Sequence, residues 1–246
     1  MKAIKYLAFS ALALIGSAPA FGSTVYTYVN STGTNSYEAI FTLDSLGVGG
    51  TGDLTVQLIN LQTSPVDDTG EIAGVNFTLS GTPGAITTPT SYSGGQVATA
   101  NSNGTLTQVY SSLSQVSAGS LRWENISGSN TNIELTALSG GQPNQLILAQ
   151  LPNGQTVYNG GSLSASITGH SPVIVGSATF VFSNISGLSS ATTISGVSFA
   201  EGTQAYPTIT SEAAILQPVP EPGTLFLFAV GLAGCTLIGQ KSQNTL

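Results

Sequence analysis

Between residues 21 and 216, apolar and polar positions alternate in short runs, a pattern typical of β-strands that bury one face. These runs are rich in valine, threonine, isoleucine and aromatic residues, which favour strands. No stretch of this region shows the 3.6-residue period of an amphipathic helix. The predicted strands are Val25–Val29, Leu54–Leu58, Val75–Leu79, Ile133–Ala137, Leu163–Ile167, Ala178–Phe182 and Ile194–Phe199.

Asparagine-glycine pairs separate several of these strands. Asn103-Gly104, Asn153-Gly154 and Asn159-Gly160 tolerate positive φ and favour tight hairpins. Many short strands with such turns predict an all-β fold for residues 21–216, an antiparallel β-sandwich of jelly-roll or immunoglobulin-like type. The stretch Gln204–Gln217 is expected to end the last strand and begin a linker.

Residues 1–20 have the composition of a secretory signal peptide. Lys2 and Lys5 form a basic start, and Tyr6–Gly16 is apolar. Ala18 and Ala20 fit the small-residue cleavage pattern, with Ala20-Phe21-Gly22 as the alternative. The apolar run is too short to span a bilayer comfortably. We therefore predict a signal-peptide helix, export through the Sec translocon, and cleavage at Ala18–Ala20.

Residues 217–246 form a C-terminal tail with a proline-rich start and an apolar segment. Pro218, Pro220 and Pro222 alternate with other residues, which prevents helix and sheet pairing and favours an accessible extended segment. Leu225–Gly239 then carries no charge, and in lipid such a segment satisfies its backbone groups as a helix. Lys241 follows it, as the positive-inside rule expects of a cytoplasmic end. The prediction is a short transmembrane helix.

This tail resembles the PEP-CTERM sorting signal of Gram-negative bacteria. The resemblance implies that Pro220, Glu221 and Pro222 are recognised by exosortase, a membrane-embedded sorting protease. It also implies that the protein crosses the inner membrane transiently and then reaches the cell surface or the extracellular matrix. Relatives usually end in an arginine cluster, and only Lys241 stands here. The alternative is a plain C-terminal membrane anchor that is never cut.

Segments of the body resemble an uncharacterised domain that recurs with this tail. The resemblance implies a shared fold and no particular activity. The segments are Leu54–Pro65, Ile72–Ser80, Leu138–Leu148 and His170–Gly202.

The scarcity of charged residues limits the classes of partner that the protein can bind. Only 6% of residues are charged, and Arg122 is the one basic residue in residues 21–216. Phosphate binding needs clustered basic side chains, so we expect no nucleic-acid partner. The single cysteine leaves no intramolecular disulfide to stabilise the exported domain.

Candidate catalytic residues are few. His170 is the only histidine, and no G-x-S-x-G elbow places a nucleophile. Asp67, Asp68 and Glu71 share one loop and are a weak candidate for a Ca²⁺ site, the alternative being a solvated acidic turn. We therefore expect a protein that is not an enzyme and that binds no cofactor or metal.

Carbohydrate binding is the strongest alternative role, because sandwich modules present exposed aromatic rings to sugars. The candidate residues are Trp123, Tyr92, Tyr110 and Tyr158, although a lone tryptophan on a strand is more often part of a core. The leading hypothesis is a non-catalytic, exported surface or matrix protein. The alternatives are a carbohydrate-binding module acting on exopolysaccharide and a plain membrane-anchored protein.

Overall fold

The computed structural model describes a large part of the predicted body of the chain. The described residues are 23–30, 36–45, 50–62, 70–101, 103–137, 144–151, 158, 171–189, 191–202, 211–213 and 215–217. The predicted signal peptide, the tail from residue 218 onward, the strand Leu163–Ile167 and the turns Asn153-Gly154 and Asn159-Gly160 lie outside these ranges.

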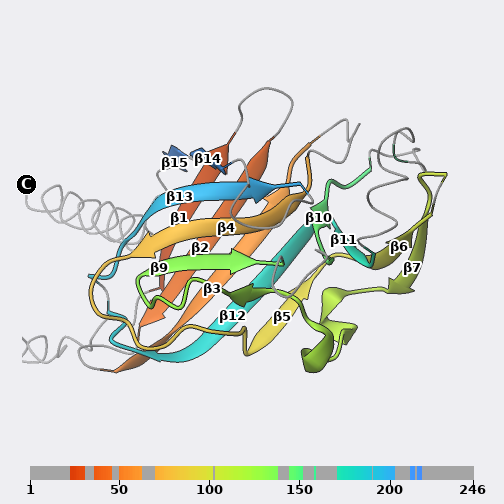
Figure 1. Cartoon of the computed structure of the whole chain (residues 1–246). Coiled ribbons are helices and arrows are strands. Elements are labelled where there is room, and N and C mark those ends of the chain that lie inside the picture. The colour runs from red at the N-terminus through yellow and green to blue at the C-terminus, as the bar shows by residue number, and fades with distance from the viewer. Residues whose placement is uncertain are drawn as a thin grey trace, which may run out of the picture.

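One sheet is antiparallel throughout and has six strands in the order β15-β1-β2-β3-β12-β5 (Figure 1). Along β3, every second residue is buried, which confirms the period-two prediction for Leu54–Leu58. The strands are β1 (Ser23–Asn30), β2 (Tyr37–Ser45), β3 (Thr51–Asn60), β5 (Ser91–Gly94), β12 (Ser177–Ser186) and β15 (Ile215–Gln217).

The second sheet has nine strands, of which seven follow the order β14-β13-β4-β10-β11-β6-β7, while β9 pairs with β4 and β8. Its strands are β4 (Ile72–Leu79), β6 (Val97–Ala100), β7 (Leu106–Tyr110), β8 (Glu124–Asn125), β9 (Asn132–Thr136), β10 (Ile147–Leu148), β11 (Val173–Val175), β13 (Ile194–Glu201) and β14 (Ser211–Ala213). The pair β10–β11 is parallel, with Ile147 opposite Ile174. This sheet is therefore mixed, and the prediction of a wholly antiparallel sandwich is wrong at this pair. Parallel neighbours need a long crossover, and the chain between Leu148 and Val173 is long enough to provide one.

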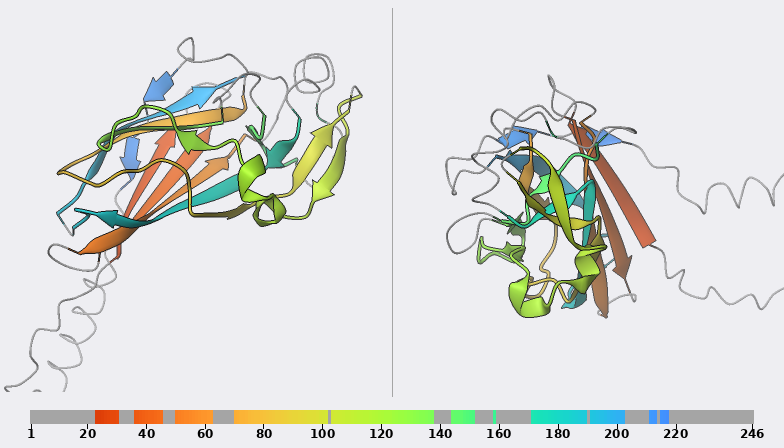
Figure 2. Two further views of the ribbon diagram at one scale, coloured as in Figure 1. Left: turned by 60° about the horizontal axis from the view of Figure 1, so that its bottom comes forward. Right: turned by 90° about the vertical axis from the view of Figure 1, so that its right-hand side faces the viewer.

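The two sheets face each other across one hydrophobic core (Figure 2). The ring of Phe41 on β2 lies 4.8 Å from that of Phe77 on β4 and 5.9 Å from that of Tyr28 on β1. Tyr37 and Phe199 make a second contact between the sheets, with 5.3 Å between their ring centroids. Such burial is the main stabilising contribution to a fold of this kind, and the prediction of an all-β, sandwich-like protein is confirmed.

Residues 211–217 depart from the expectation of a linker. Ser211–Ala213 pairs with β13 in the second sheet, and Ile215–Gln217 pairs with β1 in the first. The chain therefore crosses from one sheet to the other directly before the proline-rich segment. Among the described residues, no helix is long and apolar enough to cross a membrane.

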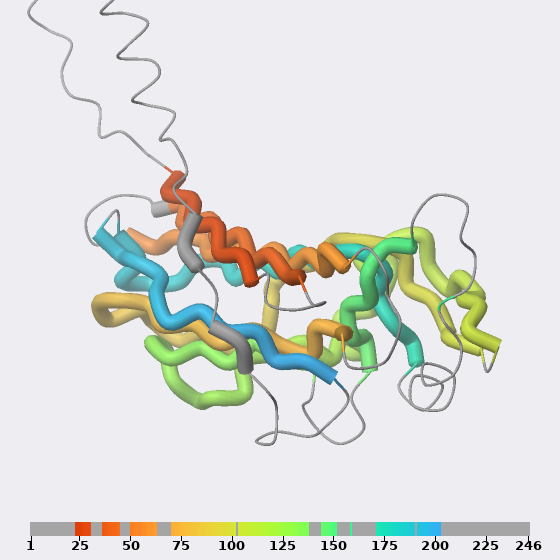
Figure 3. Tube along the Cα trace, turned by 90° about the horizontal axis from the view of Figure 1, so that it is seen from above, coloured from red at the N-terminus to blue at the C-terminus, as the bar shows by residue number. Residues whose placement is uncertain are grey.

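The β6–β7 hairpin extends the second sheet at one end of the molecule (Figure 3). Its turn contains the predicted Asn103-Gly104 pair, and Gly104 has φ +78°, a conformation that glycine adopts without steric cost. The backbone N–H of Asn101 donates to the carbonyl of Thr105 at 2.9 Å and closes the turn. A small separate core of Ala100, Leu148, Tyr158 and Val173 supports the hairpin.

Candidate functional site

Trp123 is part of the core and not of the surface. Its side chain is 1% exposed, and its ring stacks on Phe180 of β12 with 4.8 Å between the centroids. The indole N–H donates to the backbone carbonyl of Gln145 at 2.8 Å, which satisfies the polar atom of the buried ring. Because neither ring face reaches solvent, Trp123 cannot stack on a sugar as the sequence hypothesis requires.

Tyr158 is equally enclosed. Its side chain has no exposed surface, and its hydroxyl donates to the carbonyl of Ala149 at 2.8 Å. Burial raises the pKa of Tyr158 above the usual value of 10.0, because a phenolate would lose its hydration. Tyr158 therefore leaves the set of candidate sugar-stacking rings.

Tyr92, on β5, also has a structural role. Its ring packs against the main core, and its hydroxyl donates to the carbonyl of Val116 at 2.8 Å. Val116 ends the first of two short 3-10 turns, Leu113–Gln115 and Ala118–Ser120. Tyr92 thus fixes the segment that carries these turns.

Of the four predicted aromatic residues, Tyr110 has the most exposed ring, at 39%. It stands at the end of β7, opposite Val97, whereas Gln108 stands opposite the next residue, Ala98. Val109 is therefore the extra residue of a β-bulge, a feature that changes the direction of neighbouring side chains. The bulge places Val109 and Tyr110 on the wall of the same cavity, although adjacent strand residues normally face opposite sides.

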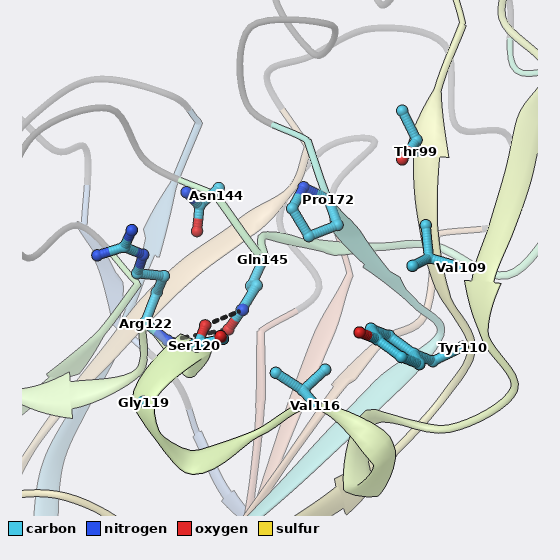
Figure 4. Close-up of a pocket in the computed structure, with 10 residues that line it drawn as sticks. All are labelled: Thr99, Val109, Tyr110, Val116, Gly119, Ser120, Arg122, Asn144, Gln145 and Pro172. Atoms are coloured by element: carbon cyan, nitrogen blue, oxygen red, sulfur yellow. Dashed lines mark hydrogen bonds between the residues drawn. The ribbon is translucent and has the colours of Figure 1, made fainter.

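This cavity, of about 390 Å³, lies between the hairpin, the 3-10 turns and the segments around residues 122, 145 and 172. Its size falls within the range of small-ligand sites. Figure 4 shows the Tyr110 ring with its hydroxyl directed into the cavity, facing Pro172, Gln145 and Val116. The lining residues are Thr99, Val109, Tyr110, Val116, Gly119, Ser120, Arg122, Asn144, Gln145 and Pro172.

Gln145 connects the parts of the cavity wall. Its side-chain Oε1 accepts from the backbone N–H of Arg122 at 3.0 Å, and its Nε2 donates to the carbonyl of Ser120 at 2.6 Å. Its backbone N–H donates to the carbonyl of Pro172 at 2.5 Å. Gln145 is 2% exposed and has φ +63°, an uncommon conformation for a residue with a Cβ. Such backbone strain persists where surrounding contacts enforce it, often at binding sites.

Asn144 and Arg122 form the polar end of the cavity. The Oδ1 atom of Asn144 is buried and has no hydrogen-bond partner in the described part of the structure. The guanidinium of Arg122 extends at the same end as Asn144 (Figure 4). An unsatisfied buried acceptor of this kind costs about 1–3 kcal/mol of stability.

The acidic residues of the predicted Ca²⁺ site are described only in part. Asp67, Asp68 and also His170 lie outside the described residues. Glu71 is 1% exposed, so it does not belong to a solvated turn. Burial raises the pKa of Tyr37, and the negative charges of Glu201 and then Glu71 raise it further. Within the described ranges, no group of three or more histidine, cysteine or acidic side chains could hold a metal ion.

The sequence identified part of this site. Of the four candidate aromatic residues, only Tyr110 lines this cavity, and Asn144, Gln145 and Pro172 were not among the candidates. Asn144 and Gln145 lie in the segment Leu138–Leu148, whose resemblance to a recurrent domain stays a prediction.

Comparison with known proteins gives a finding for the tail. No curated protein and no solved structure matches the chain. The family model of the PEP-CTERM protein-sorting motif matches residues 218–241, which include Pro220, Glu221, Pro222 and Lys241. The resemblance predicted from the sequence is confirmed: the chain carries a PEP-CTERM sorting motif at its C-terminal end.

Proposed function

We propose that this chain is an exported, non-catalytic surface or extracellular-matrix protein, sorted by exosortase through its C-terminal tail. The observation that carries the proposal is the match of residues 218–241 to the PEP-CTERM protein-sorting motif. A sorting protease needs an extended substrate, and the alternate prolines of the motif favour that conformation.

The proposed route has three stages. The N-terminal signal peptide, with Ala18 and Ala20 at its cleavage site, directs the chain to the Sec translocon. The apolar segment Leu225–Gly239 then holds the chain in the inner membrane, and its absence of charge supports this role. Exosortase recognises Pro220, Glu221 and Pro222, and the processed protein moves to the surface or the medium.

Cell fractionation tests this proposal with two variants and one control. The first variant lacks residues 218–246, and the second replaces Pro220, Glu221 and Pro222 by alanine but keeps the apolar segment. The control replaces Gln243 by alanine, outside the matched region. We expect the second variant to accumulate in the inner membrane and the first to be secreted without surface retention. The control should be located like the wild type.

An unchanged location of the triple-alanine variant would contradict exosortase sorting. If that variant and the wild type both remain in the inner membrane at full length, the chain is a plain membrane-anchored protein.

We further propose that the sandwich is related to the jelly-roll or immunoglobulin-like architectures. The repeated passage of the chain between the two sheets supports this relation, since β3, β5 and β12 lie in one sheet and β4, β6, β11 and β13 in the other.

A second candidate function is carbohydrate binding, with exopolysaccharide as the proposed target. The observation that favours it is the exposed ring of Tyr110 on the wall of a cavity that also contains hydroxyl, amide and guanidinium groups. Sugars combine apolar C–H faces with hydroxyl groups, and such a cavity offers contacts to both.

A further inference from the structure

We propose that the outer edge of β1 at Ser23–Val25 binds the chain's own sorting motif, with residues 218–221 continuing β15 as an extended edge strand. The surface is the part of β1 that β15 leaves uncovered, and the occupant is the segment that follows Gln217 directly. The docking is a property of this chain alone, and only its consequence for exosortase rests on the proposed sorting function.

The strand β15 covers only part of the outer edge of β1. The pairing ends where Thr27 lies opposite Gln217, and no described strand lies beyond it, opposite Ser23 and Val25. Proteins usually protect a sheet edge with charged residues or prolines, and β1 has neither. Val25 is also 37% exposed. This edge is therefore suited to receive another strand, and the antiparallel direction of β15 leads the following residues along it.

The hydrogen bonds of the neighbouring strands show which residues of β1 face this edge. In an antiparallel pair, opposite residues alternate between bonded and non-bonded, so one bond sets the alternation of the whole ladder. The backbone N–H of Leu61 donates to the carbonyl of Ser36 at 2.8 Å. The regular registers of β3 with β2 and of β2 with β1 then direct the even-numbered residues of β1 toward β2. Its odd-numbered residues therefore direct their N–H and carbonyl groups toward β15.

A bond on the other side of β3 gives the same alternation. The backbone N–H of Asn60 donates to the carbonyl of Gly176 at 2.9 Å, so the even-numbered residues of β3 face β12. The odd-numbered residues of β3, such as Leu61, are left to face β2. The two bonds agree on the odd-numbered edge of β1.

Continuing the register of β15 places two tail residues opposite this edge. Because Thr27 is odd-numbered, the N–H and carbonyl of its partner Gln217 face β1. The same orientation recurs at every second residue of a strand. The next bonded pairs in this register are Val219 with Val25 and Glu221 with Ser23.

The alternate prolines of the tail fit the remaining positions. In this register the nitrogens of Pro218, Pro220 and Pro222 face away from β1, where a missing N–H breaks no pairing. The prolines thus prevent sheet pairing on the outer edge of the tail and leave its inner edge able to pair. Val219 also brings its side chain to the same face as the exposed Val25, as opposite residues of a ladder do.

Docking makes the sorting motif available to exosortase only after its release from β1. Pro220 and Glu221 belong to the docked strand, so the enzyme binds only the undocked fraction of the chain. Its apparent affinity for the motif is reduced by that fraction. The folded body therefore controls how fast the tail is removed.

Disulfide trapping tests the docking on the full chain, purified in detergent from cells without exosortase. Cys235 is first replaced by serine, so that the introduced thiols are the only two. The test variant is Val25→Cys/Val219→Cys, whose Cα atoms are about 5.5 Å apart in the proposed pair, within the range of a disulfide. The matched control is Val25→Cys/Pro218→Cys, in which the tail thiol moves by one residue and points to the other face of the sheet.

Both variants are equilibrated in the same glutathione buffer, and the intramolecular disulfide is quantified by intact mass after alkylation. We expect an effective thiol concentration at least about tenfold higher in the test variant than in the control. A loosely tethered tail would bring either thiol to residue 25 equally often. Equal disulfide fractions, or no disulfide in the test variant, overturn the docking.

Hydrogen exchange of the Val25 amide decides the question if the test variant does not fold. Val219→Pro removes the donor that faces β1, whereas the control Val219→Ala keeps it. We expect the Val25 amide to exchange at least about tenfold faster in Val219→Pro than in Val219→Ala. Equal exchange rates overturn the docking.

Tail removal in cells that contain exosortase separates docking from sorting. Exported proteins meet an oxidising environment, so the disulfide of the test variant forms there and holds the motif on β1. We expect this variant to keep its tail to Leu246, while the control and the wild type lose it. Processing of the test variant like the control overturns the masking of the motif. A wild-type chain that keeps its tail contradicts the sorting proposal, and the docking is then judged on the purified protein alone.

Discussion

The middle of the core and the hairpin end of the sandwich use aromatic residues in opposite ways. In the middle of the core, Phe41 and Phe77 are almost fully buried and pack directly on each other between the sheets. At the hairpin end, Tyr110 is exposed. There the side chains of Trp123 and Tyr92 donate hydrogen bonds to backbone carbonyls next to a cavity. The first arrangement stabilises the fold, and the second supports an open surface at the edge of it.

This difference separates residues that maintain the cavity from residues that could contact a ligand. The cavity wall is held by hydrogen bonds of Trp123, Tyr92 and Gln145. The cavity is also lined by Tyr110, Asn144 and Arg122. Substitutions in the core should therefore change stability strongly, and substitutions on the cavity surface should change it little.

Replacing Phe41 by alanine should produce the largest effect. The ring has no exposed surface and contacts both sheets, so its loss should reduce the free energy of unfolding by about 3–5 kcal/mol. Urea unfolding followed by the fluorescence of Trp123, the only tryptophan, measures the change. Val25→Ala is the control, because Val25 lies on the same sheet but is 37% exposed. A loss below about 1 kcal/mol would contradict the assignment of Phe41 to a closely packed core.

Replacing Gln145 by alanine should produce an intermediate effect. The backbone N–H of Arg122 and the carbonyl of Ser120 would lose their partners, at about 1–3 kcal/mol of unfolding free energy. The same urea unfolding measures it, with Gln108→Ala as the control on the exposed strand β7. Equal stabilities of the two variants would show that Gln145 does not hold the wall.

Replacing Tyr158 by phenylalanine removes one buried hydrogen bond, to Ala149, and should cost about 0.5–1.5 kcal/mol at neutral pH. The variant also tests alkaline stability. Because burial raises the pKa of Tyr158 above 10.0, the folded state keeps its proton where the unfolded state loses it. This contribution is fully present below about pH 10 and is lost as pH rises through the folded pKa.

Between about pH 8 and pH 11, the free energy of unfolding should therefore fall less in Tyr158→Phe than in the wild type. An equal fall in both proteins would mean that Tyr158 ionises in the folded state as it does in water.

Replacing Tyr110 by alanine should have the smallest effect on stability, within about 0.5 kcal/mol, because its ring is substantially exposed. Thermal unfolding of the variant beside the wild type measures this. A loss above about 2 kcal/mol would place Tyr110 among the supporting residues and remove the contrast between the core and the hairpin end.

Local pattern predicted much of the fold. Leu54–Leu58 alternates in sequence and in burial, and the Asn103-Gly104 turn closes a hairpin as its composition indicates. Both signals depend on only a few neighbouring residues, so they can be recognised in a single sequence. The parallel pairing of Ile147 with Ile174 could not be predicted, because it depends on how a long crossover returns to the sheet.

The candidate site was predicted only in part for the same reason. Burial of Trp123 and Tyr158 results from strands distant in sequence, and their own neighbours give no sign of it. The exposure of Tyr110 together with Val109 depends on a bulge, and the position of Asn144 depends on the unusual backbone of Gln145. Glu71 shares a loop with two other acids in sequence, yet its side chain is buried.

The most direct test of the sorting proposal is the intact mass of the protein recovered from the cell surface or medium. The account predicts a chain that lacks the signal peptide and has lost its apolar tail after recognition of Pro220, Glu221 and Pro222. The triple-alanine variant, recovered from the inner membrane, should retain its tail to Leu246. A surface-located wild-type protein whose mass includes every residue through Leu246 would contradict exosortase processing.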